Sequence, residues 1–339
     1  MVFVKIVLLL CNIYNMQKKI GFFLLGFLFF VGAGCAQKTP EENKLVTPSS
    51  SFDVAVSIYP LAHFIQKVGG EKVNLHLITP GGVEPHDYEP TPADIIQIQS
   101  SKAFVFNGAG VDTWAESLQD DLIKKGVTSL EMVHYMEENL ETSRDEGTDG
   151  DHEEDSHQDE HGHGEFDPHI WLDPVLAQKQ VEVIVQLLVG IDPQNKNTYE
   201  KNGAEYIAQL IELDQEYKMR LSECSLRDIV VSHDAFQYLG KRYNIEMHPI
   251  AGLSPDEEPS AARLAELSRL MKEKNITIVF FETLVTPKLA ETLAKEVGAS
   301  TLVLNPLEGL SEEQNKNGKD YDILMKENLN NLRMAMLCQ

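Results

Sequence analysis

Short apolar runs alternate with amphipathic stretches in two separate parts of the chain. In the first part, strand-like runs rich in β-branched and aromatic residues cover 53–59, 73–79 and 103–108, and helical patterns cover 60–70 and a segment that starts at Thr91. In the second part, strand-like runs cover 228–233, 245–252, 276–282 and 301–306, and helical patterns cover 254–275 and 286–298. Strands that alternate with helices are typical of a parallel sheet with helices on its faces. The pattern predicts two α/β lobes with parallel sheets, over residues 52–192 and 223–339.

A longer helical pattern lies between these two parts. Residues 193–222 hold apolar side chains at helical spacing and no proline after Pro193. About 30 residues at a rise of ~1.5 Å each would span roughly 45 Å. We therefore expect one long, rigid helix to join the lobes, and such a stiff connection disfavours a large closing motion between them.

The first 35 residues have the layout of an export signal. Lys18 and Lys19 precede an apolar run of about 15 residues, shorter than the ~20 residues that a membrane-spanning helix needs. Residues 31–35, VGAGC, resemble a bacterial lipobox, in which the cysteine is lipidated. We expect residues 1–34 to be a signal peptide, with Met16 as an alternative start, Cys35 to carry a lipid, and residues 35–51 to form a flexible tether. An uncleaved N-terminal anchor is the alternative. Both interpretations place the rest of the chain outside the cytoplasm, on the outer face of the cell membrane or in the periplasm.

The formal net charge of −24 favours cations as ligands and disfavours nucleic acid and anionic membrane surfaces as partners. Much of the acidic excess lies near residues 137–167. Within this part, residues 141–166 carry four histidines among acidic residues and glycines: His152, His157, His161 and His163. The segment has too little apolar content to pack, so we expect a disordered loop that binds metal with modest affinity, because ordering the loop costs chain entropy. A solvated run of charges is the alternative.

Two of the four cysteines remain in the folded part once Cys11 and Cys35 are assigned to the signal and the lipid. An even pair outside the cytoplasm predicts a disulfide between Cys224 and Cys338, and two buried thiols are the alternative. No two cysteines have CxxC spacing, so a thiolate metal site is not expected.

Three of the eleven histidines stand where a ligand could be held firmly. His86 lies in a loop stiffened by prolines, His169 lies in DPHIWLDP, and His233 ends the strand-like run VVSH. In α/β sheets, ligands bind outside the carboxyl ends of the strands. We expect the remaining histidines outside the acidic loop to be surface, sheet-face or core residues: His63, His76, His134 and His248.

Four motifs, in order along the chain, resemble the metal-binding lipoproteins of bacterial ABC importers. They are PHDYEPTP (85–92), DPHIWLDP (167–174), VVSHDAFQYLGKRYNI (230–245) and FFETLVTPKLAETLA (280–294). The resemblance is closest to the zinc-specific branch of that family, whose members often carry a histidine-rich acidic insertion at the position of residues 141–166. It implies two (β/α) lobes bridged by a rigid helix, with the metal in the cleft between them.

The resemblance also implies three histidines and one carboxylate as metal ligands. Carried over, these are His86 and His169 from the first lobe and His233 from the second. We favour Glu308 as the fourth ligand, and Glu282 is the second choice, with a supporting role if Glu308 is the ligand. As a separate hypothesis, nearby acidic residues could accept hydrogen bonds from the imidazole N–H groups, or else serve as helix caps and turn residues: Asp87, Asp173 and Asp234.

This ligand set agrees with zinc chemistry, because Zn²⁺ favours four-coordinate tetrahedral sites of imidazole nitrogen and carboxylate oxygen. The family resemblance implies a monomeric, exported receptor that binds Zn²⁺ as transported cargo and delivers it to an ABC permease. A manganese receptor of the same family and a metal-dependent surface adhesin are the alternatives. Manganese prefers more oxygen ligands, and manganese-binding relatives have a carboxylate at the position of His233. A zinc hydrolase is disfavoured because a fourth protein ligand would close the open position that a catalytic zinc keeps, and the sequence has neither HExxH nor GxSxG. We therefore expect no enzymatic activity.

Deletion of residues 145–165 should lower the number of zinc ions bound while one tight site remains. The reason is that the acidic loop and the cleft supply separate ligands. Calorimetric titration of the mature and loop-deleted proteins with zinc measures both quantities, and loss of the tight site together with the loop would contradict the cleft assignment.

Overall fold

The structure is a computed structural model that describes residues 51–136 and 167–339. The expected signal peptide, Cys35, the tether up to residue 50 and the four histidines of the acidic loop lie outside the described residues.

The first lobe is built on a four-stranded parallel sheet with strand order β2-β1-β3-β4. Its strands are β1 (Phe52–Val56), β2 (Val73–Leu77), β3 (Ala103–Phe106) and β4 (Thr128–Glu131). Its helices are α2 (Tyr59–Gly69), α3 (Pro92–Ser100), α4 (Thr113–Glu116), α5 (Gln119–Lys124) and α7 (Pro174–Ile191). Short 3₁₀ turns form at η1 (Gly70–Lys72), η2 (Pro85–Asp87) and η3 (Ile170–Leu172).

The second lobe repeats this topology, with strand order β6-β5-β7-β8 and all pairings parallel. Its strands are β5 (Asp228–Val231), β6 (Glu246–Pro249), β7 (Ile278–Phe281) and β8 (Ser300–Val303). Its helices are α9 (Gln237–Tyr243), α10 (Ala261–Lys274), α11 (Lys288–Val297), α12 (Glu312–Lys316) and α13 (Tyr321–Ala335). The predicted fold class of two α/β lobes with parallel sheets is thereby confirmed.

The helix predicted over 254–275 begins seven residues later, at Ala261. The side chain of Ser260 accepts a hydrogen bond from the backbone N–H of Arg263 and so caps the helix. Pro255 and Pro259 lie in the part of the predicted helix that is not helical, residues 254–260. A proline disfavours helical backbone in the residue before it. The helical side-chain spacing therefore overestimates how far the helix extends toward the N-terminus.

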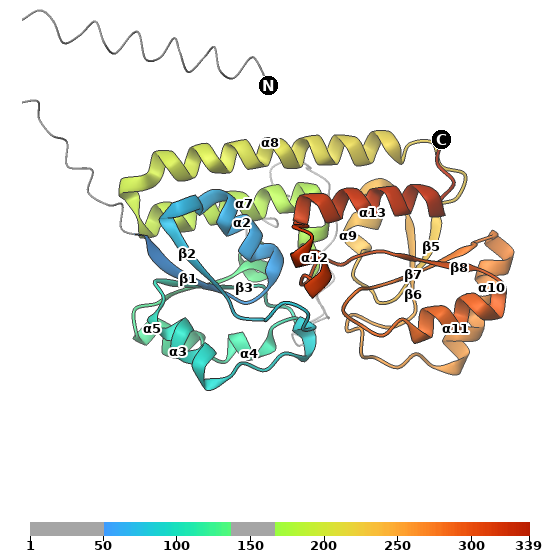
Figure 1. Cartoon of the computed structure of the whole chain (residues 1–339), viewed down its shortest axis with the longest axis horizontal. Helices are drawn as coiled ribbons and strands as arrows, with labels where there is room; N and C mark the ends of the chain where they lie inside the picture. The colour runs from blue at the N-terminus through green and yellow to red at the C-terminus, as the bar shows by residue number, and fades with distance from the viewer. Residues whose placement is uncertain (1–50, 137–166) are drawn as a thin grey trace, which may run out of the picture. The chain divides into compact units, whose positions relative to one another are not determined.

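The long connecting helix is α8 (Lys196–Arg220), which follows a 3₁₀ turn, η4 (Pro193–Asn195). It runs along both lobes (Figure 1). Asn202 on α8 donates a hydrogen bond to the carbonyl of Val68 in the first lobe, at 2.9 Å. Tyr206 and Tyr217 donate to Asp322 and to the carbonyl of Met325 in the second lobe, at 3.0 and 2.6 Å. The helix is thus hydrogen-bonded to both lobes, as a stiff linker should be.

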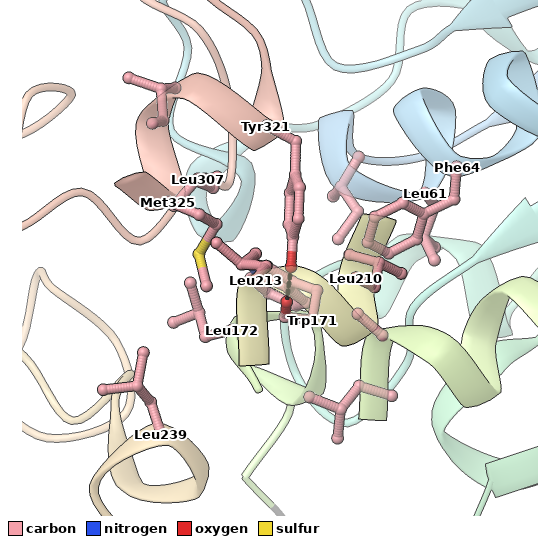
Figure 2. Close-up of a cluster of buried hydrophobic side chains, with 14 of the residues drawn as sticks. Leu61, Phe64, Trp171, Leu172, Leu210, Leu213, Leu239, Leu307, Tyr321 and Met325 are labelled. Carbon is pink, nitrogen blue, oxygen red and sulfur yellow. Dashed lines mark hydrogen bonds between the residues drawn. The ribbon is translucent and has the colours of Figure 1, made fainter. Parts of the chain in front are cut away.

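One continuous apolar core extends from the first lobe through α8 into the second lobe. Figure 2 shows its centre, where Trp171 and Tyr321 lie among side chains from both lobes and from α8. These include Leu61, Phe64, Leu210, Leu213, Leu307 and Met325. Since any separation of the lobes would expose this shared core to water, the core opposes such a movement.

Cys224 and Cys338 form a disulfide in the structure, with an S–S distance of 2.01 Å. The two residues also pair as an isolated antiparallel bridge, and the backbone N–H of Leu226 donates to the carbonyl of Met336. The bond joins the segment after α8 to the segment after α13 across 114 residues of chain.

Gly203 marks a close approach of α8 to α7. A Cβ atom placed on Gly203 would lie 2.3 Å from Cγ2 of Val185. Helix propensity favours Ala over Gly by ~1 kcal/mol, but forced overpacking costs about 1–3 kcal/mol. We expect Gly203→Ala to destabilise the protein. Urea unfolding of the metal-free form should show this as a lower midpoint concentration.

Gly190→Ala is the matched control for this substitution. Gly190 lies in the last turn of α7, and a Cβ atom placed there would have no neighbouring atom within 4 Å. This control should be neutral or stabilising by up to ~1 kcal/mol. A Gly203→Ala protein as stable as the wild type would show that α7 and α8 can move apart without loss.

Candidate metal centre

Four side chains from both lobes bring their donor atoms to one buried point. His86, His169, His233 and Glu308 each offer one donor atom, and these atoms all lie within 4.8 Å of one another. His169 and His233 are fully buried, and Glu308 is 1% exposed. His86 lies in the turn that follows β2, His233 follows β5 and Glu308 follows β8. These three therefore lie beyond the carboxyl ends of parallel strands, where ligands of α/β sheets bind.

Three of the four donor atoms, those of His169, His233 and Glu308, have the mutual spacing of a tetrahedral zinc site. Oε1 of Glu308 lies 3.2 Å from Nε2 of His169, 3.4 Å from Nε2 of His233 and 3.7 Å from Nε2 of His86. The Nε2 atoms of His169 and His233 are 3.4 Å apart. A tetrahedron with metal–ligand bonds of ~2.0–2.1 Å has edges of about 3.4 Å. A small shift of His86 would complete this geometry.

The proline-rich loop around His86 restrains the backbone that carries its imidazole. Pro85 begins η2, and the side chain of Glu84 accepts from the backbone N–H of His86 at 3.5 Å. Further along the loop, Thr91 and Asp94 form a capping box that starts α3. The segment between β2 and α3 is thus fixed at both ends, and the chain entropy lost on metal binding is correspondingly small.

A carboxylate orients each of the two fully buried imidazoles. Asp167 Oδ1 lies 2.8 Å from Nδ1 of His169, and Glu282 Oε1 lies 2.6 Å from Nδ1 of His233. With Nδ1–H donating to its carboxylate, each ring turns its Nε2 lone pair toward Glu308. Glu282 therefore stands outside the donor group, on the far side of the His233 ring, which fits the supporting role expected for it if Glu308 is the ligand.

The three aspartates proposed for this orienting role have other partners, so that hypothesis was wrong. Asp173 caps α7 through the N–H of Val175 and pairs with Nε of Arg242 at 2.6 Å. Asp234 accepts from the side-chain amide of Gln237, and a hydrogen bond with Asp256 raises the pKa of Asp87. Proximity in sequence favoured these aspartates. The same rule would have found Asp167, two residues before His169, but not Glu282, 49 residues from His233.

In the metal-free form the centre favours charged imidazoles at His169 and His233 beside a charged carboxylate at Glu308. Burial lowers the pKa of His169, but hydrogen bonds to Asp167 and Glu308 outweigh it and leave that pKa raised. Burial acts in the same way on His233, and Glu282 and Glu308 hold its pKa well above the usual value. Burial raises the pKa of Glu308, yet the adjacent imidazoles of His169, His233 and His86 hold it well below the ordinary range. Protonated imidazoles are thus favoured beside the buried carboxylate of Glu308, whose negative charge they balance.

Glu84 is a further acidic group at the centre that the sequence did not single out. Burial and the adjacent Glu308 carboxylate raise the pKa of Glu84 to about 10. At neutral pH Glu84 is therefore uncharged and adds no negative charge to the donor set.

Several buried polar atoms of the centre have no hydrogen-bond partner among the described residues. They are Nε2 of His86, Oε2 of Glu308, Oε2 of Glu282 and Oε2 of Glu84. A buried polar atom without a partner costs about 1–3 kcal/mol, so such a concentration requires an explanation. A bound cation would supply the missing partner for His86 and Glu308.

A second group of possible donors already holds a cation of its own. His63, Asp320 and Asp322 also lie within 4.8 Å of one another. However, Nζ of Lys67 lies 2.9 Å from Asp322 and 3.9 Å from Asp320, so an ammonium group occupies the place of a metal. Of the other histidines that were set aside, His76 pairs with Asp53 at 2.8 Å and His248 with Asp228 at 3.0 Å.

Comparisons with known proteins identify relatives of this chain. The sequence profile of the ZnuA family, described as "Zinc-uptake complex component A periplasmic", matches residues 54–335. The "High-affinity zinc uptake system protein ZnuA" of Bacillus subtilis (strain 168) is 40% identical over 323 residues, which cover 95% of this chain and 98% of that relative.

Solved structures have the same fold. The zinc(II)-bound ZnuA-like domain of Streptococcus pneumoniae AdcA is 38% identical, with a TM-score of 0.69 over 85% of this chain and 99% of that one. The laminin-binding protein Lmb of Streptococcus agalactiae, described as bifunctional with adhesin and metal transporting activity, is 28% identical, with a TM-score of 0.69 over 84% of this chain and 100% of that one. By its sequence profile, which spans nearly all of both lobes, the chain belongs to the ZnuA family of zinc-uptake components.

Proposed function

We propose that this chain is an exported receptor that binds Zn²⁺ with high affinity and delivers it to an ABC permease for zinc uptake. The observation that carries the proposal is the buried group of three imidazoles and one carboxylate with tetrahedral spacing. The family and the functions of its members, high-affinity zinc uptake in Bacillus subtilis and zinc binding in Streptococcus pneumoniae, support it.

The ligands in this proposal are His86, His169, His233 and Glu308, with Asp167 and Glu282 fixing two of the imidazoles. Four protein donors leave no open position for a water nucleophile, which supports a transport role over hydrolysis. Manganese prefers more oxygen donors than the single carboxylate supplied here, so the manganese alternative has less support.

The cellular setting of the receptor is also a proposal. A lipid on Cys35 would hold the mature protein at the outer face of the cell membrane, and a monomer would dock with the permease. The Streptococcus agalactiae protein combines adhesin and metal transporting activity, so adhesion could accompany zinc binding on this fold. Nothing in the described residues supports a surface for a host protein, and zinc delivery remains the preferred function.

Comparison of Glu308→Ala with Glu282→Ala should distinguish the metal ligand from the carboxylate that orients an imidazole. Loss of an orienting carboxylate lowers metal affinity about 10- to 100-fold. We expect Glu282→Ala to fall in that range and Glu308→Ala to lose more, because it removes a donor atom and the charge that balances zinc. Competition with a zinc chelator measures both affinities, and His233→Ala serves as the reference for loss of a ligand. Equal effects of the two glutamates, or tighter binding of manganese than of zinc, would refute this assignment.

Zinc binding should release protons at pH 7. Since the pKa values of His169 and His233 are raised, their imidazoles hold protons to a higher pH in the metal-free form than ordinary imidazoles do, whereas zinc requires them neutral. Zinc affinity should therefore fall as the pH is lowered through the raised pKa values of these two imidazoles. We expect roughly one to two protons released per zinc, measured by calorimetry in buffers of different ionisation enthalpy.

Asp167→Asn tests the cause of this proton release. The substitution removes the carboxylate that raises the pKa of His169, so fewer protons should leave on zinc binding at pH 7. Zinc binding without any proton release in the wild-type protein would show that the imidazoles are already neutral.

A further inference from the structure

Trp171 connects the two loops that carry His169 and Glu308. Its indole Nε1–H donates a hydrogen bond to the carbonyl of Pro306 in the second lobe, at 2.7 Å. Its own carbonyl accepts a hydrogen bond from the hydroxyl of Tyr321, also in the second lobe, at 2.5 Å (Figure 2). Trp171 follows His169 by two residues, and Pro306 precedes Glu308 by two. A fully buried side chain therefore fixes one ligand loop against the other.

The indole also supports the His169 imidazole directly. The two ring centroids are 5.2 Å apart and the rings are inclined at 61°, an edge-to-face arrangement. Asp167 holds the same imidazole through Nδ1. Between the carboxylate and the indole, the ring of His169 has little freedom to turn away from Glu308.

The backbone of the Glu308 loop needs such support. Leu307, directly before Glu308, has a φ angle of +59°, which is unfavourable for a residue with a branched side chain. A conformation of this kind costs about 1–3 kcal/mol and persists only when the surroundings enforce it. Asn305 Oδ1 accepts from the N–H of Leu307 at 2.8 Å, and Trp171 Nε1 holds the carbonyl of Pro306. Without the indole N–H, the loop loses one of these two restraints.

We propose that Trp171 is a positioning residue that sets the separation of His169 and Glu308 and thereby favours zinc over larger cations. This inference rests on the proposed zinc function. The separation of Nε2 and Oε1 is 3.2 Å, close to the ~3.4 Å edge of a tetrahedral zinc site. A cation that needs more ligands or longer bonds requires this edge to lengthen. Because Trp171 ties the two loops across the lobes, lengthening it breaks a buried hydrogen bond or strains the loop further.

Trp114, the other tryptophan of the chain, supplies a matched control. It is also largely buried, but its Nε1 has no hydrogen-bond partner among the described residues. It packs in a separate cluster of the first lobe with Phe104 and Phe106. Trp114→Phe therefore makes the same reduction in ring size as Trp171→Phe without removing a hydrogen bond.

The experiment measures zinc and manganese affinities of the full mature protein by chelator competition for the wild type and both variants. We expect Trp171→Phe to weaken zinc binding about tenfold or more and to weaken manganese binding less. The ratio of zinc affinity to manganese affinity should therefore fall. Trp114→Phe should leave both affinities within about twofold of wild type. An unchanged ratio in Trp171→Phe, including an equal loss for both metals, would overturn the inference, since a merely structural role lowers both alike.

Urea unfolding and the variant Tyr321→Phe complete the test. If Trp171→Phe fails to fold, as judged by urea unfolding of the metal-free form, Tyr321→Phe replaces it. That variant removes the hydroxyl that donates to the Trp171 carbonyl and should lower the ratio of zinc affinity to manganese affinity. An unchanged ratio in that variant would overturn the inference. A wild-type protein without tight zinc binding would instead refute the proposed function, whereas tight wild-type binding with no effect of either variant refutes only the role of Trp171.

Discussion

The carboxylate of Glu308 lies buried in contact with three imidazoles, and the surrounding structure keeps its charge compensated. An isolated buried carboxylate would be strongly unfavourable, so positive charge must be supplied. In the metal-free form, His169 and His233 supply it, because Asp167 and Glu282 favour their protonated forms and raise their pKa values. In the proposed zinc complex, the metal replaces those protons. The same set of side chains can therefore hold either protons or zinc with little rearrangement.

The lobes that supply these side chains are not independent bodies. They share one apolar core, α8 is hydrogen-bonded to both, and Trp171 bonds across them beside the metal centre. This arrangement differs from a binding protein whose lobes swing about a flexible hinge. Geometry at the centre is set by packing that extends far beyond the four donor residues, and that is why a residue such as Trp171 can influence which metal fits.

The sequence predicted those parts of the molecule that depend on local pattern. Strand-like apolar runs and helical spacing located seven of the eight strands in the described residues, the connecting helix and the loops with His86, His169 and His233. The edge strand β4, with the sequence TSLE, was missed because it is only half-buried and has no apolar run. Helix α7 was missed although it is apolar, because a helix with apolar residues on most sides lacks a clear polar face. The partnership of His233 with Glu282 and of Trp171 with Pro306 joins residues 49 and 135 positions apart, which no local pattern encodes.

The shared core has a consequence for how a transported ion could leave. A receptor with hinged lobes can lose its cargo through thermal opening, so its off-rate follows the frequency of that motion. Here, opening would expose the aromatic side chains around Tyr321 to water and break the hydrogen bonds of α8 on one side. Spontaneous loss of the ion would then be slow, and release would depend on an event that loosens this packing. A metal held in this centre would therefore have a long residence time.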